Sequence, residues 1–213
     1  MMMLIPGHLA HLHSGLIDQM FRLRAKVFSE RLEWDVRVEN GHERDKYDDL
    51  EPLYALAVTD DGRVIGTFRL LQTTGPHMLA EVFKELMPEG IPVRSPIIWE
   101  STRFCVDTEL AQARGDKGLS HITAILLSSL LEVGLQAGLS HILTVIDVRM
   151  ERILRRAGCP IDRLAPPKLV GKVPSLAILM ECTEESVAKV QRTNGLDGNC
   201  LEPSQVWASS RAA

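Results

Sequence analysis

Six charged residues stand in or beside apolar segments in the first half of the chain, where isolated charges are unusual. They are Arg24, Asp45, Asp48, Arg69, Glu100 and Arg103. A buried charge without a partner is very costly, so these residues must pair with one another or with a ligand. Two interpretations stay open: structural ion pairs that fix a polar loop to a sheet, or a binding site for a charged small molecule. In a binding site, Glu100 would act as a general base if burial tunes its pKa.

The segment 97–106 is predicted to be a strand, and its two charges do not fit regular alternation. Side chains alternate between the faces of a strand, so Glu100 and Arg103 would point in opposite directions. A bulge would return both to one site, and bulges are common beside active sites. Without a bulge, Arg103 is expected to be the structural member of the set.

The elements that position these residues follow from the apolar periodicity. A helix over residues 12–31 carries Arg24. The polar segment 34–50 supplies carboxylates, with Glu43 and Asp49 as further candidate partners. Two strands, over 53–59 and 63–72, form a hairpin through Asp60-Asp61-Gly62. The remaining predictions are helices over 78–87, 118–136 and 149–157, strands over 141–146, 161–164 and 173–182, and a last helix capped by Thr183.

This order predicts an α/β fold with three layers, in which helices flank a mixed, mostly antiparallel sheet, as in N-acyltransferases. One domain is expected over residues 1–192, followed by a flexible tail over 193–213. The net charge of −4 argues against nucleic acid as the main partner. No apolar run is long enough to span a membrane, and no signal peptide is recognised, so we expect a cytoplasmic protein.

The four cysteines are widely spaced, which suits reduced thiols and argues against a disulfide framework or a zinc site. His8, His11 and His13 lie close together near the start of the chain. They have no cysteine or carboxylate partner at ligand spacing, so no metal site is expected and a solvated first turn is favoured.

A longer pattern of charged and aromatic residues joins the six charges. It reads Arg24-x-x-x-Phe28, Trp34, Asp45-x-x-Asp48, Arg69, Phe83 and Glu100-x-x-Arg103, with the local segments RLRAKVF, GTFRLLQTTGP and WESTRF. In order and spacing this pattern resembles the signature of LuxI-type acyl-homoserine-lactone synthases, the autoinducer synthases. The resemblance is strong from Phe21 to Val106 and continues more weakly to about Val190.

The resemblance implies a reaction in two parts. The amine of S-adenosylmethionine attacks the thioester of an acyl carrier protein, or of acyl-CoA in some members. The methionine carboxylate then closes the lactone and releases methylthioadenosine. S-adenosylmethionine is a substrate, so no cofactor is implied. The catalytic residues implied are Glu100 as the base, Arg69 and Thr102. The residues implied to bind S-adenosylmethionine are Arg24, Phe28, Trp34, Asp45, Asp48, Phe83 and Arg103.

Two further sets are implied more loosely. Thr144 stands where members that make 3-oxo-acyl products often have threonine, and Ile122 and Leu126 are candidates for the acyl pocket. An ordinary core role is the alternative for all three. An acidic carrier protein requires a basic docking surface. The candidates are Arg149, Arg152, Arg155, Arg156, Lys168 and Lys172, with a solvated basic face as the alternative.

Two other functions compete with synthesis of the lactone. A generic acyl-CoA N-acetyltransferase would need a pyrophosphate loop, which residues 112–117 echo only in part because Lys117 replaces a small residue. A non-catalytic sensor of the lactone would keep the fold, but it would have no use for Glu100 and its charged companions. The sequence leaves open the acyl-chain length, its branching and 3-position oxidation, the type of donor and the oligomeric state.

Overall fold

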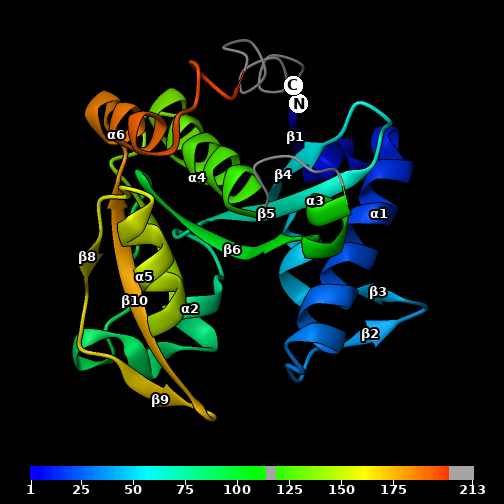
Figure 1. Cartoon of the computed structure of the whole chain (residues 1–213). Coiled ribbons are helices and arrows are strands. Elements are labelled where there is room, and N and C mark those ends of the chain that lie inside the picture. The colour runs from blue at the N-terminus through cyan, green and yellow to red at the C-terminus, as the bar shows by residue number, and fades with distance from the viewer. Residues whose placement is uncertain (114–118, 202–213) are drawn as a thin grey trace. The chain divides into compact units, whose positions relative to one another are not determined.

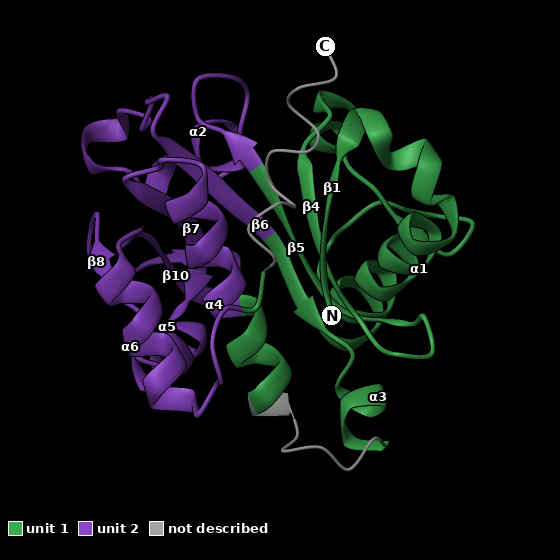
Figure 2. Ribbon diagram, turned by 90° about the horizontal axis from the view of Figure 1, so that it is seen from above, with its two compact units in different colours: residues 1–70, 103–126, 200–213 green, residues 71–102, 127–199 purple. Residues whose placement is uncertain are grey.

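The computed structural model describes residues 1–113 and 119–201 of the chain (Figure 1). The chain divides into two compact units (Figure 2). Unit 1 comprises the described parts of residues 1–70, 103–126 and 200–213, and unit 2 comprises residues 71–102 and 127–199. The chain passes between the units within β5 (Val64–Gln72), β6 (Ile98–Val106) and α4 (Leu119–Gln136).

Unit 1 is an antiparallel sheet with a long helical segment. Strand β4 (Leu53–Val58) pairs with β1 (Met2–Pro6) on one side and with β5 on the other. The helical segment runs from a 3-10 turn (Gly7–His13) through α1 (Ser14–Arg24) into a π-helical stretch (Ala25–Arg31). The short hairpin β2 (Val38–Glu39) and β3 (His42–Glu43) and a 3-10 turn (Lys46–Leu50) follow, and α3 (Thr108–Ala113) comes after β6.

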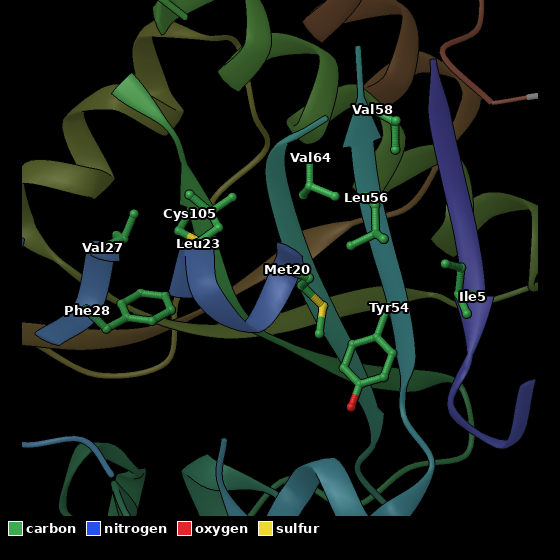
Figure 3. Close-up of a cluster of buried hydrophobic side chains, with 10 residues drawn as sticks. All are labelled: Ile5, Met20, Leu23, Val27, Phe28, Tyr54, Leu56, Val58, Val64 and Cys105. Atoms are coloured by element: carbon green, nitrogen blue, oxygen red, sulfur yellow. The ribbon is translucent and has the colours of Figure 1, made fainter. Parts of the chain in front are cut away.

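The core of unit 1 lies between the helical segment and the sheet. Met20, Leu23, Val27 and Phe28 of the helical segment are all buried at spacings of three, four and one residues, as the apolar stripe predicts. They pack against strand residues that include Tyr54 (Figure 3). Because the helix is fixed by this stripe, Arg24 is also carried into the interior.

Unit 2 contains the mixed part of the sheet. Strand β6 runs parallel to β7 (His141–Asp147), and β7 is antiparallel to β10 (Val173–Glu181). The short strands β8 (Asp162–Arg163) and β9 (Lys168–Val170) also pair with β10. The helices of unit 2 are α2 (Met78–Glu81), most of α4, α5 (Val148–Arg156) and α6 (Glu184–Asn194), with 3-10 turns over Lys84–Leu86 and Pro88–Gly90.

These pairings confirm a mixed, mostly antiparallel sheet with helices, and the predicted hairpin is present. The sequence did not reveal β1 or β9, which are short. Thr183 caps α6 as predicted, because its hydroxyl accepts the Ser186 N–H at 3.1 Å. Of the predicted tail, residues 202–213 lie outside the described residues, whereas Leu201 is buried. No described helix is long and apolar enough to cross a membrane.

Candidate active site

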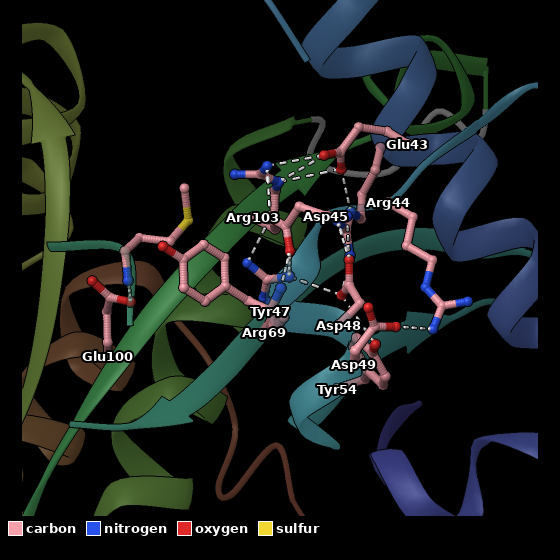
Figure 4. Close-up of polar contacts among 12 residues, drawn as sticks. Glu43, Arg44, Asp45, Tyr47, Asp48, Asp49, Tyr54, Arg69, Glu100 and Arg103 are labelled. Carbon is pink, nitrogen blue, oxygen red and sulfur yellow. Dashed lines mark hydrogen bonds and ion pairs between the residues drawn. The ribbon is translucent and has the colours of Figure 1, made fainter. Parts of the chain in front are cut away.

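Arg24 belongs to a charge network in unit 1, where it contacts Glu43 and Asp48. Figure 4 shows the carboxylates and the other two arginines of this network, which are Glu43, Asp45, Asp48, Arg69 and Arg103. Arg24 occupies the last turn of α1 and its side chain is only 1% exposed. Its Nε donates to Glu43 at 2.6 Å, and its two terminal nitrogens donate to the carboxylate of Asp48 at 2.9 Å each. A bidentate arginine–carboxylate pair of this kind is strong and fixed in direction.

The spacing Asp45-x-x-Asp48 folds the polar loop onto this arginine. The Asp45 side chain accepts the Tyr47 N–H at 2.9 Å, and Asp48 accepts the Asp45 N–H at 2.9 Å. The two aspartates thereby form a capping box at the start of the 3-10 turn. Asp48 also accepts the Tyr54 hydroxyl at 3.0 Å. The carboxylates are therefore placed by local structure before any ligand is considered.

Two further arginines reach the same carboxylates from the sheet. Arg69 of β5 donates to Asp45 at 2.6 and 3.0 Å and lies 2.8 Å from Asp48. Arg103 of β6 donates to Glu43 at 2.9 Å and lies 2.8 Å from Asp45. Three guanidinium groups thus share three carboxylates, and the network is balanced in charge.

The protonation of the network follows from this pairing. Burial alone raises the pKa of Asp48, but hydrogen bonds and charge from Arg24 and Arg69 outweigh it and hold that pKa well below its usual range. Burial lowers the pKa of Arg24, yet Asp48 and Glu43 reverse the effect and raise it. Asp48 and Arg24 are therefore both ionised. The most accessible members of the network are Asp45 and Arg103, whose side chains are 18% and 9% exposed.

Arg103 breaks the regularity of β6. Its φ of 55° lies in the left-handed region, which a bulky side chain rarely adopts inside a strand. Such irregularities are found beside functional sites, where the surrounding contacts hold them in place. Simple alternation therefore does not apply across this residue, as the sequence analysis allowed. Arg103 is tied to Glu43 and Asp45, and its side chain is 9% exposed.

Aromatic residues border the accessible edge of the network. Phe28 and Trp34 are stacked, with ring centroids 5.1 Å apart and planes inclined by 16°. The guanidinium carbon of Arg103 lies 5.5 Å from the centroid of Phe28. Phe28 is a buried core residue, whereas Trp34 is 50% exposed. Trp34 thus offers a half-exposed aromatic surface, stacked on the ring that Arg103 also contacts, and such a surface suits an organic cation.

Glu100 has a different environment, in unit 2. It is fully buried in β6, and its two carboxylate oxygens accept backbone N–H groups of Met78 at 2.8 Å and of Leu79 at 2.6 Å. These residues begin α2, so Glu100 holds the first turn of that helix. Both carboxylate oxygens of Glu100 are therefore engaged.

The other predicted site residues are placed as follows. In unit 2, Thr102 and Thr144 are half-buried on β6 and β7, and Phe83 packs against the apolar cluster of Leu79 and Leu143. In unit 1, Ile122 lines a pocket of about 270 Å³. Leu126 is buried and closes on Gly66, where a Cβ would lie only 2.8 Å from it. A core role is thus evident for Leu126.

The predicted basic surface is present on unit 2. The side chains of Arg149, Arg152, Arg155, Arg156, Lys168 and Lys172 are all exposed. Arg155 and Arg163 both pair with the buried Glu151, at 2.9 and 2.7 Å. These pairs lower the pKa of Glu151 to about 2, with the Arg163 hydrogen bond as the largest cause. Glu151 therefore fixes Arg155 and Arg163 by ion pairs. Arg152 and Arg156 are exposed on the same helix, α5.

Sequence reasoning gave too small a role to two residues. Glu43 was considered only as a partner, yet it is fully buried and bridges Arg24 and Arg103. The signal was present, because Glu43 lies in the same polar segment as Asp45. Tyr54 was not singled out within the predicted strand 53–59, although its hydroxyl donates a hydrogen bond to Asp48.

Among the described residues no cluster of histidine, cysteine or carboxylate side chains could hold a metal ion. The fold is that of an acyltransferase. An acyl-CoA N-acyltransferase from Pseudomonas aeruginosa matches it with a TM-score of 0.53 at 15% identity, covering 84% of this chain and 97% of that one. This likeness shows the fold alone.

A family model described as autoinducer synthase matches residues 8–190, and the chain belongs to this family. An acyl-homoserine-lactone synthase of Agrobacterium fabrum is 44% identical over 165 residues, which is 78% of each chain. The structure of BjaI, a CoA-dependent acyl-homoserine lactone synthase with SAM and isopentyl-CoA, matches with a TM-score of 0.81 at 29% identity, covering 93% of this chain and 90% of that one. The chain is therefore an acyl-homoserine-lactone synthase. This assignment replaces the two alternatives, a generic acyl-CoA N-acetyltransferase and a non-catalytic sensor of the lactone. The candidate pyrophosphate loop lies largely outside the described residues, at 114–118.

Proposed function

We propose that this synthase binds S-adenosylmethionine at the accessible edge of the charge network in unit 1. The observation that carries the proposal is that Asp45 and Arg103 are the most accessible charges of the network, and that Arg103 contacts Phe28, on which the half-exposed indole of Trp34 is stacked. Asp45 fits the ammonium group, Arg103 fits the carboxylate, and Trp34 offers its indole face to the sulfonium. The fully buried members, Arg24, Asp48 and Arg69, hold these groups in place. Phe28 supports the indole from below by stacking.

For acyl transfer, the amine must lose a proton before it attacks the thioester. We assign Glu100 to the acyl-transfer centre because it is a fully buried carboxylate that accepts the first two N–H groups of α2. Thr102 follows two residues later on the same strand, and Phe83 and Thr144 are assigned to the acyl side of the site. Ile122 is retained as an acyl-pocket residue because it lines a pocket.

The donor is the second part of the proposal. The BjaI structure contains isopentyl-CoA, so a CoA thioester is one donor class used within the family. For this chain we propose an acyl carrier protein, because exposed arginines and lysines gather on α5 and around β9 although the whole chain carries a net charge of −4. Carrier proteins are acidic, and complementary charge speeds encounter. None of the four cysteines, which all lie within the described residues, forms a disulfide, and this fits a reducing cytoplasm.

Release of methylthioadenosine tests this function. Purified protein is incubated with S-adenosylmethionine and a panel of acyl carrier proteins and acyl-CoAs, and the lactone is identified by mass spectrometry. We expect lactone and methylthioadenosine in equal amounts, with higher kcat/KM for a carrier-protein donor. Turnover with acyl-CoA alone would remove the carrier protein from the proposal, and no turnover with any donor would overturn the proposed function.

A further inference from the structure

The turn between β5 and α2 is held in one shape from two sides. The Thr73 side chain is fully buried, and its hydroxyl lies 2.9 and 2.7 Å from the carbonyl oxygens of Ser95 and Ile98. From the surface, Arg94 donates through Nη1 to the carbonyl of Gly75 at 3.0 Å. All these residues belong to unit 2. A turn fixed in this way can present a side chain with little loss of conformational entropy.

The side chain that this turn presents is His77. Its Nδ1 lies 3.0 Å from the Gly75 carbonyl oxygen, which can only accept, so Nδ1 carries the proton. The Nε2 atom is then an acceptor with a free lone pair. His77 is fully buried, and within residues 1–113 and 119–201 no group donates to Nε2. A buried acceptor without a partner is destabilising and is uncommon outside functional sites.

Burial favours the neutral form of the His77 imidazole. It is the main cause that lowers the pKa of His77, and the charge of Arg94 lowers that pKa further, whereas the hydrogen bond to the Gly75 carbonyl and the charge of Glu81 raise it. A general base needs a neutral imidazole in which one N–H donates to a fixed acceptor and the other nitrogen has a lone pair for a proton. His77 meets both requirements. The hydrogen bond at Nδ1 fixes both the tautomer and the ring direction.

Glu100 is held by the residues that directly follow His77. The N–H groups of Met78 and Leu79 both donate to its carboxylate. These two hydrogen bonds tie the Glu100 carboxylate to the backbone that follows His77. The Nε2 atom of His77, by contrast, accepts no hydrogen bond from the described residues. Glu100 therefore fixes the backbone on one side of His77, and Arg94 fixes it on the other.

We propose that His77 is the base of the acyl-transfer step and that Glu100 is the positioning residue that holds its turn; this assignment rests on the proposed function. One proton of the substrate ammonium passes to Nε2, and the freed lone pair forms the C–N bond to the thioester carbon. The C–S bond then breaks with its electron pair on sulfur. The second nitrogen proton goes to that sulfur, which leaves as a thiol, and the imidazolium later loses its proton to solvent.

The variants His77→Asn and His77→Gln test the assignment with the full chain. Asn can still donate to the Gly75 carbonyl and is a favoured residue before a helix, but it lacks the basic nitrogen. We expect kcat to fall about 100- to 1000-fold, as for loss of a general base, with KM for S-adenosylmethionine within about threefold. The fall of kcat at acidic pH in the wild type should also be absent. The matched control is His8→Asn, because His8 is exposed in the 3-10 turn of unit 1.

The outcomes separate the two proposals. A His77→Asn protein that keeps kcat within threefold and the same acidic limb of its pH profile would overturn the role of His77. If this variant does not fold, His77→Gln decides by the same readouts, because its amide fills the ring position without accepting a proton. The proposed function fails in a different experiment, in which the wild type itself releases no methylthioadenosine with any donor.

Discussion

The charge network of unit 1 and the turn that holds Glu100 in unit 2 use buried charge in opposite ways. In the network, Arg24, Arg69 and Arg103 meet Glu43, Asp45 and Asp48, so that each buried charge has an opposite charge beside it. In unit 2, the buried carboxylate of Glu100 is held by two backbone N–H groups. His77, next to these donors in sequence, keeps an acceptor that no described group occupies.

This difference indicates that the network interior serves mainly stability and that the turn in unit 2 serves mainly catalysis. A self-neutral network is saturated, so removing one member leaves a buried charge of the opposite sign and affects folding first. Among its described members, Asp45 and Arg103 are the most accessible. In unit 2, the Nε2 atom of His77 accepts no hydrogen bond from the described residues, and we have proposed that it takes part in proton transfer. We therefore expect substitutions in the network interior to change stability, those at its edge to change KM, and those around Glu100 to change kcat.

Arg24→Met should give the largest effect. Met fills a similar volume in the apolar core but leaves Glu43 and Asp48 short of their main cation. Breaking a buried ion pair costs about 3–5 kcal/mol. We expect urea unfolding at pH 7 to show a loss of this size, with Arg37→Met as the control because its pair with Glu39 is exposed. A stability loss below about 1 kcal/mol in Arg24→Met would show that the network is not structural.

Glu100→Gln is expected to lower kcat strongly and the stability only slightly. The amide can accept only one of the two N–H groups, since its nitrogen opposes the other. The start of α2 loosens, and kcat should fall roughly 100-fold, as when a catalytic base is misplaced. The melting temperature should fall by only a few degrees. Glu181→Gln, at an exposed position of β10, is the control. A kcat equal to wild type would remove Glu100 from the acyl-transfer centre.

The sequence predicted the scaffold well because apolar periodicity is a local signal. The helix over residues 12–31, the hairpin and the strand around Glu100 were all found from it. The short strand β9, by contrast, depends on pairing with β10, which no local pattern encodes. The six charges were also correctly singled out as buried or nearly buried, since charges in apolar segments are rare.

What the sequence could not supply is which partner each charge takes. Five of the six charged residues join one network, whereas Glu100 accepts hydrogen bonds from backbone N–H groups. A buried charge needs a partner, but either kind of partner meets that need. The direction of the Arg103 side chain depends on a left-handed backbone conformation, which arginine rarely adopts, so its residue type did not predict it. His77 carried no signal, because a histidine after Gly-Pro reads as an ordinary turn residue until its ring is seen to be buried with a free nitrogen.

At the edge of the network, Trp34→Leu should raise KM for S-adenosylmethionine while folding is unchanged. Loss of a cation–π contact of about 0.5–2 kcal/mol corresponds to a roughly 2- to 30-fold change. Trp34→Phe keeps an aromatic face and should lie between leucine and the wild type. The measurement is KM with saturating acyl donor, alongside the melting temperature. Equal KM values in all three proteins would place the substrate cation away from this indole.

The smallest effect is expected at the basic surface of α5, where neither network nor turn is involved. Arg152→Glu combined with Arg156→Glu reverses two exposed charges that lie one helical turn apart. Repulsion of an acidic carrier protein should raise KM for that donor several-fold at low salt, and the difference should shrink in 0.5 M salt because exposed charges are screened. Acyl-CoA serves as the control within the same variant, since its KM should change less. If the KM values of the two donors change equally, the substitutions act through folding or general electrostatics. The α5 surface would then have no role in docking the carrier protein.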